Sequence, residues 1–279
     1  MIGTAAQPPR RPASSGRALK YAAAGLITAF MLFPLYLISV AALSPAGSVF
    51  DYPRRLFPTS ISFESMSFFL NFAGILPALG RSLIVGVLTV IFALALGCPA
   101  GYAIARYKFF GRDLIQLLIV SVRAFPVLIL AIPLAVTFIN WNIYDTIFSV
   151  AIVHTVMALP LTILLAASVF VRIPNELEEA AMSLGTGRLG AVWRIVLPLS
   201  RPGLGAAALF AFVLSWNEVF AAAVLTTRNP TLPAQIVTSL GQSPLPFRFA
   251  GGLALTAPAF VFIFFMRPYL FSAFGQGGH

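Results

Sequence analysis

Residues 173–202 read IPNELEEAAMSLGTGRLGAVWRIVLPLSRP, a polar, glycine-containing stretch between two long apolar runs. The pattern predicts two short helices. Asn175 is expected to cap the first helix with Glu178 completing a capping box, and Gly185 is expected to end it. Thr186 is expected to cap the second helix, and the prolines at 198 and 202 redirect the chain after it. The segment is therefore predicted to be a compact helical hairpin.

Both predicted helices have an apolar stripe at helical spacing. Such stripes predict that the hairpin packs against the rest of its own chain. The two stripes consist of Leu177, Ala180, Ala181 and Leu184 in the first helix, and of Leu189, Val192, Trp193 and Val196 in the second.

Outside this hairpin the composition is that of a membrane protein. Hydrophobic residues make up 59% of the 279 residues and charged residues only 9%, which is more apolar surface than a globular core can bury. A bilayer core about 30 Å thick needs roughly 20 helical residues to cross it. Six apolar runs reach that length: 19–43, 82–105, 114–138, 147–171, 203–226 and 249–270. The predicted fold class is all-α integral membrane, with six transmembrane helices and the hairpin, residues 173–202, between spans four and five.

The distribution of positive charge predicts the orientation. With the N-terminus in the cytoplasm, twelve of the 18 basic residues lie on the cytoplasmic side and one, Arg123, lies inside span three. The positive-inside rule then places both termini and the hairpin in the cytoplasm. We expect disordered cytoplasmic tails at 1–18 and 272–279 around a membrane domain at 19–271. The basic residues that give the net charge of +10 lie at the ends of the spans and form no continuous basic face. We therefore expect lipid as the partner and not nucleic acid.

No catalytic, metal or nucleotide-binding pattern is present in the sequence. It has no phosphate-binding loop and no paired-carboxylate site, and its two histidines, His154 and His279, stand alone. We therefore expect no catalytic residue, no metal and no cofactor in this chain, and energy supplied by another polypeptide.

Within the hairpin, Glu-Ala-Ala is followed after three residues by Gly and after nine more by Ile-x-Leu-Pro. This spacing resembles the cytoplasmic signature of the permeases of bacterial ABC importers. The resemblance implies that the hairpin fits a groove on a separate ATPase subunit, with Glu179 as a polar contact and Gly185 as the turn. The residues assigned to ATPase coupling are Glu178, Glu179, Ala180, Ala181, Gly185, Ile195, Leu197 and Pro198.

Further motifs are similar to the carbohydrate-uptake branch of that family, the maltose-type systems. These are residues 101–109 (GYAIARYKF) with Gly111, Trp216-Asn217-Glu218, and Thr231-Leu232-Pro233. Leu184 and Arg81 depart from the branch, which usually has Asp and Asn there.

The resemblance implies that the chain is half of a pore in the bacterial cytoplasmic (inner) membrane. Its implied partners are a second homologous permease in a heterodimer, two copies of an ATPase that bind ATP and Mg, and an extracytoplasmic solute-binding protein or lipoprotein. The expected cargo is a sugar or related polyhydroxylated solute. An anionic solute such as a glycerophosphodiester is the alternative, and a passive channel or a membrane enzyme is a distant one.

Polar residues inside the spans are candidates for the translocation path. Arg123 is expected to line the path or to pair with an acid of the second permease, and an internal ion pair is an equal alternative. Asn217 and Glu218 suit a hydroxyl-rich solute or helix-to-helix hydrogen bonds, whereas Trp216 suits a sugar ring or an interfacial aromatic belt. His154 belongs to the same set, although a packed, hydrogen-bonded role is expected for it.

Overall fold

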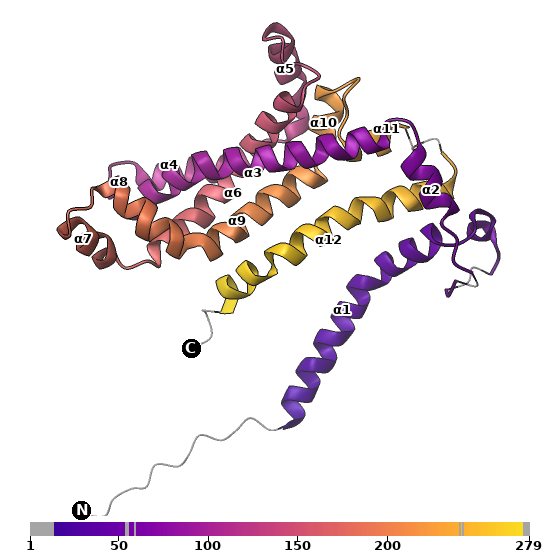
Figure 1. The fold of residues 1–279 in the computed structure, drawn as a ribbon, viewed down its shortest axis with the longest axis horizontal. Coiled ribbons are helices and arrows are strands. Elements are labelled where there is room, and N and C mark those ends of the chain that lie inside the picture. Colours follow the sequence, from indigo (N-terminus) through magenta and orange to yellow (C-terminus); the bar gives the residue numbers. More distant parts are fainter. Residues whose placement is uncertain (1–13, 54–55, 59, 240, 242, 276–279) are drawn as a thin grey trace, which may run out of the picture.

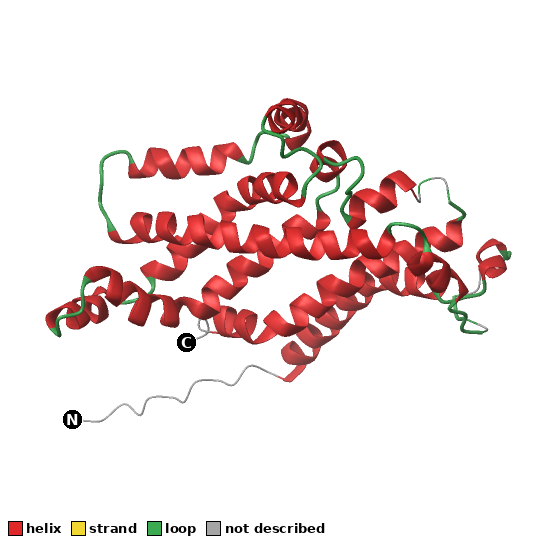
Figure 2. Ribbon diagram, turned by 45° about the horizontal axis from the view of Figure 1, so that its top comes forward, coloured by secondary structure: helices red, strands yellow, loops and turns green. Residues whose placement is uncertain are grey.

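The protein is described by a computed structural model that covers residues 14–53, 56–58, 60–239, 241 and 243–275. Every regular element in these ranges is helical (Figures 1 and 2). The elements are α1 (Ser14–Ala42), η1 (Ala46–Phe50), α2 (Glu64–Asn71), α3 (Ile75–Arg106), α4 (Arg112–Val122), α5 (Val127–Asn140), α6 (Ile147–Val171), α7 (Asn175–Ser183), α8 (Arg188–Ala191), η2 (Val192–Val196), α9 (Leu197–Asn217), α10 (Phe220–Leu225), α11 (Leu232–Ser239) and α12 (Leu245–Gly275).

The helices account for the six predicted spans. Five described helices are long and apolar enough to cross a membrane, and α4 and α5, which meet at a bend of 89°, count as a sixth span if the pair is taken as one. The all-α membrane fold with a hairpin between spans four and five is therefore confirmed. Helix α1 already begins at Ser14, inside the predicted tail, and α12 continues to Gly275. The rest of the two predicted tails, 1–13 and 276–279, lies outside the described residues.

The long helices run back and forth between two ends of the molecule, and we name these ends by what they carry. The hairpin end holds α7 and α8, and the far end holds α2 and α11 (Figure 1). Helices α3, α6 and α9 form the centre, with α12 against α9. Phe212 of α9 stacks on Phe262 of α12, with ring centroids 4.0 Å apart.

Glycine allows α3 and α6 to approach closely. A Cβ atom on Gly101 would lie 2.8 Å from the Cβ of Ala166 and 2.8 Å from the backbone nitrogen of Ala167. Gly97, one turn earlier, meets Thr162 in the same way, at 2.8 Å. Small residues four apart are typical of helix pairs in membranes, where packing replaces the hydrophobic drive that water provides. This contact fixes span two against span four, and so determines where the hairpin that follows α6 emerges.

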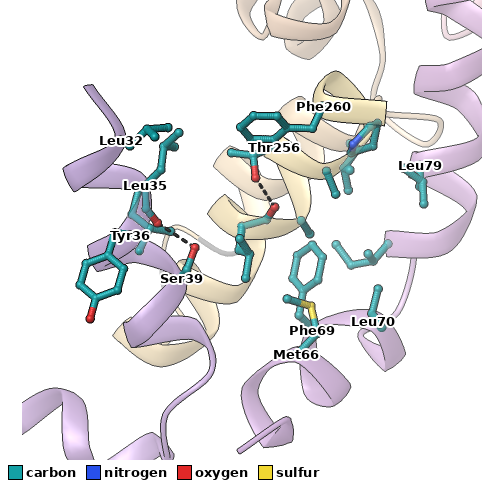
Figure 3. Close-up of a pocket in the computed structure, with 17 residues that line it drawn as sticks. Leu32, Leu35, Tyr36, Ser39, Met66, Phe69, Leu70, Leu79, Thr256 and Phe260 are labelled. Carbon is teal, nitrogen blue, oxygen red and sulfur yellow. Dashed lines mark hydrogen bonds between the residues drawn. The ribbon is translucent and has the colours of Figure 1, made fainter. Parts of the chain in front are cut away.

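Helix α1 diverges from α12 toward its own N-terminal end (Figure 1). Of its residues 18–42, only Ala41 and Ala42, at the C-terminal end, are buried. The wedge between the two helices is an apolar cavity of about 780 Å³ (Figure 3). The hydroxyls of Ser39 and Thr256 in its wall donate to carbonyls of their own helices, at 2.7 Å each, so the wall offers few polar groups. An apolar wall of this kind suits lipid or a neighbouring membrane helix.

Candidate functional site: the hairpin and the broken spans

The hairpin turns at Gly185, as predicted. Its φ of +86° lies in the left-handed region that glycine adopts without a steric penalty. The Gly185 N–H donates to the carbonyl of Met182 at 3.0 Å and the Thr186 N–H donates to that of Ala181 at 3.1 Å. These two bonds form a Schellman motif, which satisfies the last carbonyls of α7.

The predicted caps of the two hairpin helices are wrong. Pro174 occupies the N-cap position of α7 and Gly187 that of α8, and neither helix has a side-chain cap. Asn175 is the first residue inside α7. Glu178 turns away from the helix end because charged partners on α3 offer it stronger hydrogen bonds than a backbone N–H does.

Glu178 fastens the hairpin to span two. Its Oε1 lies 2.6 Å from both Nε and Nη2 of Arg106, and its Oε2 accepts a hydrogen bond of 2.6 Å from the hydroxyl of Tyr102. The side chains of Glu178 and Arg106 are each only 7% exposed. A second contact places the guanidinium of Arg188 4.9 Å from the ring centroid of Tyr107. The hairpin and the end of α3 are therefore expected to move together.

The prediction that the apolar stripes hold the hairpin to its own bundle is wrong for the large residues. Ala181, Ala191 and Val196 are buried, but large side chains of both stripes face outward because the hairpin extends beyond the end of the bundle (Figure 1). The exposed fractions are 42% for Leu177, 87% for Leu184, 77% for Leu189 and 70% for Trp193. We call these four residues the hairpin apolar face.

The remaining signature residues surround this face. Glu179 and Ala180 are exposed on α7, whereas Ile195, Leu197 and Pro198 are half-buried where the hairpin enters α9. Residues Val192–Val196 form a π-helical turn, η2, in which the Leu197 N–H reaches back to the carbonyl of Val192. Such turns interrupt α-helices frequently at functional sites.

Span three breaks at Arg123. Helix α4 ends at Val122, Pro126 is extended, and α5 starts at Val127. The Arg123 side chain is exposed and lines a cavity of about 790 Å³ formed mainly by α5 and α6. It has no hydrogen bond or ion pair within the described residues, so the internal ion pair is not formed.

Span five breaks at the predicted Trp-Asn-Glu motif. Helix α9 ends at Asn217, whose side chain is exposed, and Glu218 is extended. The Glu218 carboxylate accepts a 2.8 Å hydrogen bond from the N–H of Ala221 and so caps α10. Trp216 lies in the core, where its indole N–H donates to the carbonyl of Leu255 at 2.9 Å. Trp216 is only 2% exposed and lines neither of the two large cavities.

His154 is a packed residue, as expected. It is buried, and its Nδ1 lies 2.8 Å from the hydroxyl of Ser215, which also accepts a 3.3 Å bond from Thr89. These three side chains connect α6, α9 and α3. Of the five residues predicted for the path, Arg123 alone lines the cavity at the broken third span.

The sequence did not reveal a cluster at the far end centred on Asp145. Its Oδ1 accepts hydrogen bonds from the backbone N–H groups of Thr227, Arg228 and Asn229, at 2.9, 3.1 and 3.1 Å. Asp145 has a φ of +60°, which Asp tolerates better than most residues. Arg81, one of the departures from the sugar branch, donates to the carbonyl of Pro230 at 2.8 Å. The loop between α10 and α11 is thereby attached to spans two and four.

Replacing Asp145 by alanine is expected to release this loop. Three N–H groups lose their acceptor, and each such loss costs about 0.5–1.5 kcal/mol or more. In detergent-solubilised protein, trypsin should cut after Arg228 about tenfold faster than in the wild type. Asp145→Asn, which keeps an acceptor oxygen and tolerates a positive φ, is the control. Equal cleavage rates in Asp145→Ala and the wild type would show that Asp145 does not hold the loop between α10 and α11 in place.

The fold and the site together define a multi-pass membrane subunit of a transport system. Residues 93–269, which include the hairpin and both broken spans, match the family described as binding-protein-dependent transport system inner membrane component. The chain belongs to this family. Its members are transporter permease subunits without an ATPase site of their own, so ATP hydrolysis is the task of a partner subunit.

Named relatives cover nearly the whole chain. The trehalose transport system permease protein SugB of Mycobacterium tuberculosis (strain CDC 1551 / Oshkosh) is 29% identical over 90% of this chain and 93% of its own length. The sulfoquinovosyl glycerol transport system permease protein SmoH of Agrobacterium fabrum (strain C58 / ATCC 33970) is 31% identical over 84% of this chain and 82% of its own length.

A solved structure has the same fold. A chain from a bacterial ABC transporter involved in the import of the acidic polysaccharide alginate matches with a TM-score of 0.71 and 20% identity. The match covers 94% of this chain and 99% of that one.

Proposed function

We propose that this chain is one of the two permeases of an ATP-driven ABC importer for a sugar or a related polyhydroxylated solute. Its relatives are named for trehalose and sulfoquinovosyl glycerol, and the solved transporter of the same fold imports alginate. The chain would form half of the pore in the cytoplasmic membrane of a bacterium, with its membrane domain at 19–271.

The single observation that carries this proposal is the exposed hairpin apolar face on a firmly attached hairpin. Large apolar side chains this exposed at the end of a membrane protein are unfavourable in water unless a partner covers them, and exposed apolar surface of this kind marks interaction sites. The partner we propose is the ATPase subunit, bound in the cytoplasm, with Glu179 at the rim of the contact and Gly185 at its tip. The Glu178–Arg106 pair then passes the movement of the ATPase to span two.

The other proposed partners follow from the remaining surfaces. Helix α4 has no buried residue and much of α1 is exposed, so both offer apolar faces to a second, homologous permease. Two permeases present two hairpins and therefore call for two ATPase copies, which bind ATP and Mg. The far end, where Asp145 binds the loop between α10 and α11, would face the solute-binding protein. With α4 and α5 counted as one span, the six spans would put both termini on the hairpin side, in the cytoplasm.

Uptake by whole cells tests this function. A strain that lacks this chain should lose the ATP-dependent accumulation of sugars from a labelled mixture of neutral and acidic mono- and oligosaccharides, and the intact gene should restore it. Affinity purification of the tagged chain should also yield an ATPase. Unchanged accumulation of every sugar in the deletion strain, with no ATPase in the purified sample, would refute the proposal.

A further inference from the structure

If α4 begins at the membrane surface, the break in span three lies near mid-membrane. Helix α4 has 11 residues and is therefore about 16 Å long, roughly half the thickness of a bilayer core of about 30 Å. The carbonyls of Arg123, Ala124 and Phe125 accept no hydrogen bond from any described residue. Unsatisfied backbone at this depth is tolerated only where protein covers it or where it lines a water-filled cavity. These three residues are exposed, so this chain does not cover them.

A cavity adjoins this break. Its volume of about 790 Å³ falls within the roughly 300–1,000 Å³ of small-molecule pockets. Its wall is mostly apolar and includes Phe125 and Trp141, each 65% exposed. Arg123 is the one charged residue in the wall. An apolar and aromatic wall with a single charged group is the usual composition of a ligand site, in which the charge sets orientation and specificity.

Arg123 has no counter-ion within its own chain. All eight acidic residues lie in the described ranges, and none comes within 4.0 Å of its guanidinium. Three of them are engaged elsewhere: Glu178 with Arg106, Asp145 with the far-end loop, and Glu218 at the start of α10. A cation at this depth is costly unless it meets an anion or water. Any anion that pairs with Arg123 therefore comes from outside the described residues.

We propose that the cavity at Arg123 binds the anionic group of the transported solute, and that the cargo is an acidic sugar carrying a carboxylate, sulfonate or phosphate. The guanidinium offers paired N–H donors that match such oxyanions in a bidentate way, while Phe125 and Trp141 provide apolar contact for the sugar ring. This inference rests on the proposed importer function and narrows its substrate class.

The test is uptake by the intact transporter in cells, with matched labelled pairs of solutes. The pairs are glucosyl glycerol with sulfoquinovosyl glycerol, sorbitol with sorbitol 6-phosphate, and glucose with glucuronate. The wild type should import an acidic member in preference to its neutral partner. Arg123→Gln should lower that import by about tenfold or more, since it removes a charge-assisted contact, and Arg123→Lys should restore part of it. Arg267→Gln removes a charge from α12 outside the cavity and should leave uptake unchanged.

Two outcomes would overturn the inference. If the wild type imports no acidic member, the cargo is not an acidic sugar; continued ATP-dependent import of neutral sugars would then leave the importer function standing. If Arg123→Gln instead lowers the amount of assembled transporter purified through a tag, the guanidinium pairs with an acid of the second permease.

Discussion

Glu178→Gln is expected to abolish uptake while the protein still inserts into the membrane. The substitution removes the negative charge that faces Arg106 and leaves that guanidinium buried without a counter-ion. Breaking a buried pair in this way costs about 3–5 kcal/mol, which exceeds what the cation–π contact of Arg188 can replace. The hairpin would then lose its fixed connection to span two. We expect sugar uptake below about a tenth of the wild-type rate, with ATPase activity no longer stimulated by the solute-loaded receptor.

Two companion variants separate the loss of the contact between the hairpin and span two from the mere loss of a negative charge. Glu176→Gln removes an acid from the exposed side of the same helix and should leave uptake near the wild-type rate. The double variant Arg106→Met with Glu178→Leu replaces both partners by apolar side chains of similar size, which often restores stability. If Glu178→Gln transports normally, or if Glu176→Gln is equally impaired, the ion pair does not connect the hairpin to span two.

The spans could be read from the sequence because their signal is local. Twenty apolar residues between charged or proline-rich ends predict a crossing helix whatever the rest of the chain does. The 89° bend at Arg123 could not be read in this way. Pro126 marks a point where a helix can break, but the same residue occurs in kinked and in broken spans, and only neighbouring helices decide between them.

The site was harder to predict because its contacts join distant residues. Glu178 lies three residues after Asn175, which is the spacing of a capping box, and its true partner Arg106 is 72 residues earlier. Trp216 has the chemistry of a sugar-binding residue, yet its indole N–H donates to a carbonyl in α12 and its ring is buried in the core. Residue type indicated that these side chains mattered, but burial decided their role.

The apolar stripes of the hairpin show a second limit of sequence-based prediction. Helical spacing correctly placed Leu177 and Leu184 on one face and Leu189 and Trp193 on another. It could not indicate what covers these faces, since the hairpin extends beyond its own bundle (Figure 1). A stripe in sequence therefore predicts burial, and the structure shows that this chain does not itself bury the large residues of these stripes.

A carboxylate placed on the hairpin apolar face should detach the ATPase. Leu184 and Leu189 are 87% and 77% exposed, so Leu184→Glu and Leu189→Glu leave the packing of this chain intact. In the complex, each loses about 1.5–3 kcal/mol of apolar burial and places a charge in an apolar contact. We expect ATPase recovered with the tagged chain to fall about tenfold for each single variant, and to be absent for the double variant.

Ser183→Glu is the matched control for this experiment. It adds the same charge to an exposed position next to Leu184 without removing apolar surface. It should retain the ATPase, and all the variants should keep the thermal stability of the wild-type membrane subunit, because none of the three positions is buried. Full ATPase recovery with the double variant would mean that the partner binds elsewhere. Because Glu178→Gln should keep the ATPase bound but uncoupled, whereas Leu184→Glu with Leu189→Glu should release it, the two experiments together separate docking of the ATPase from transmission of its movement.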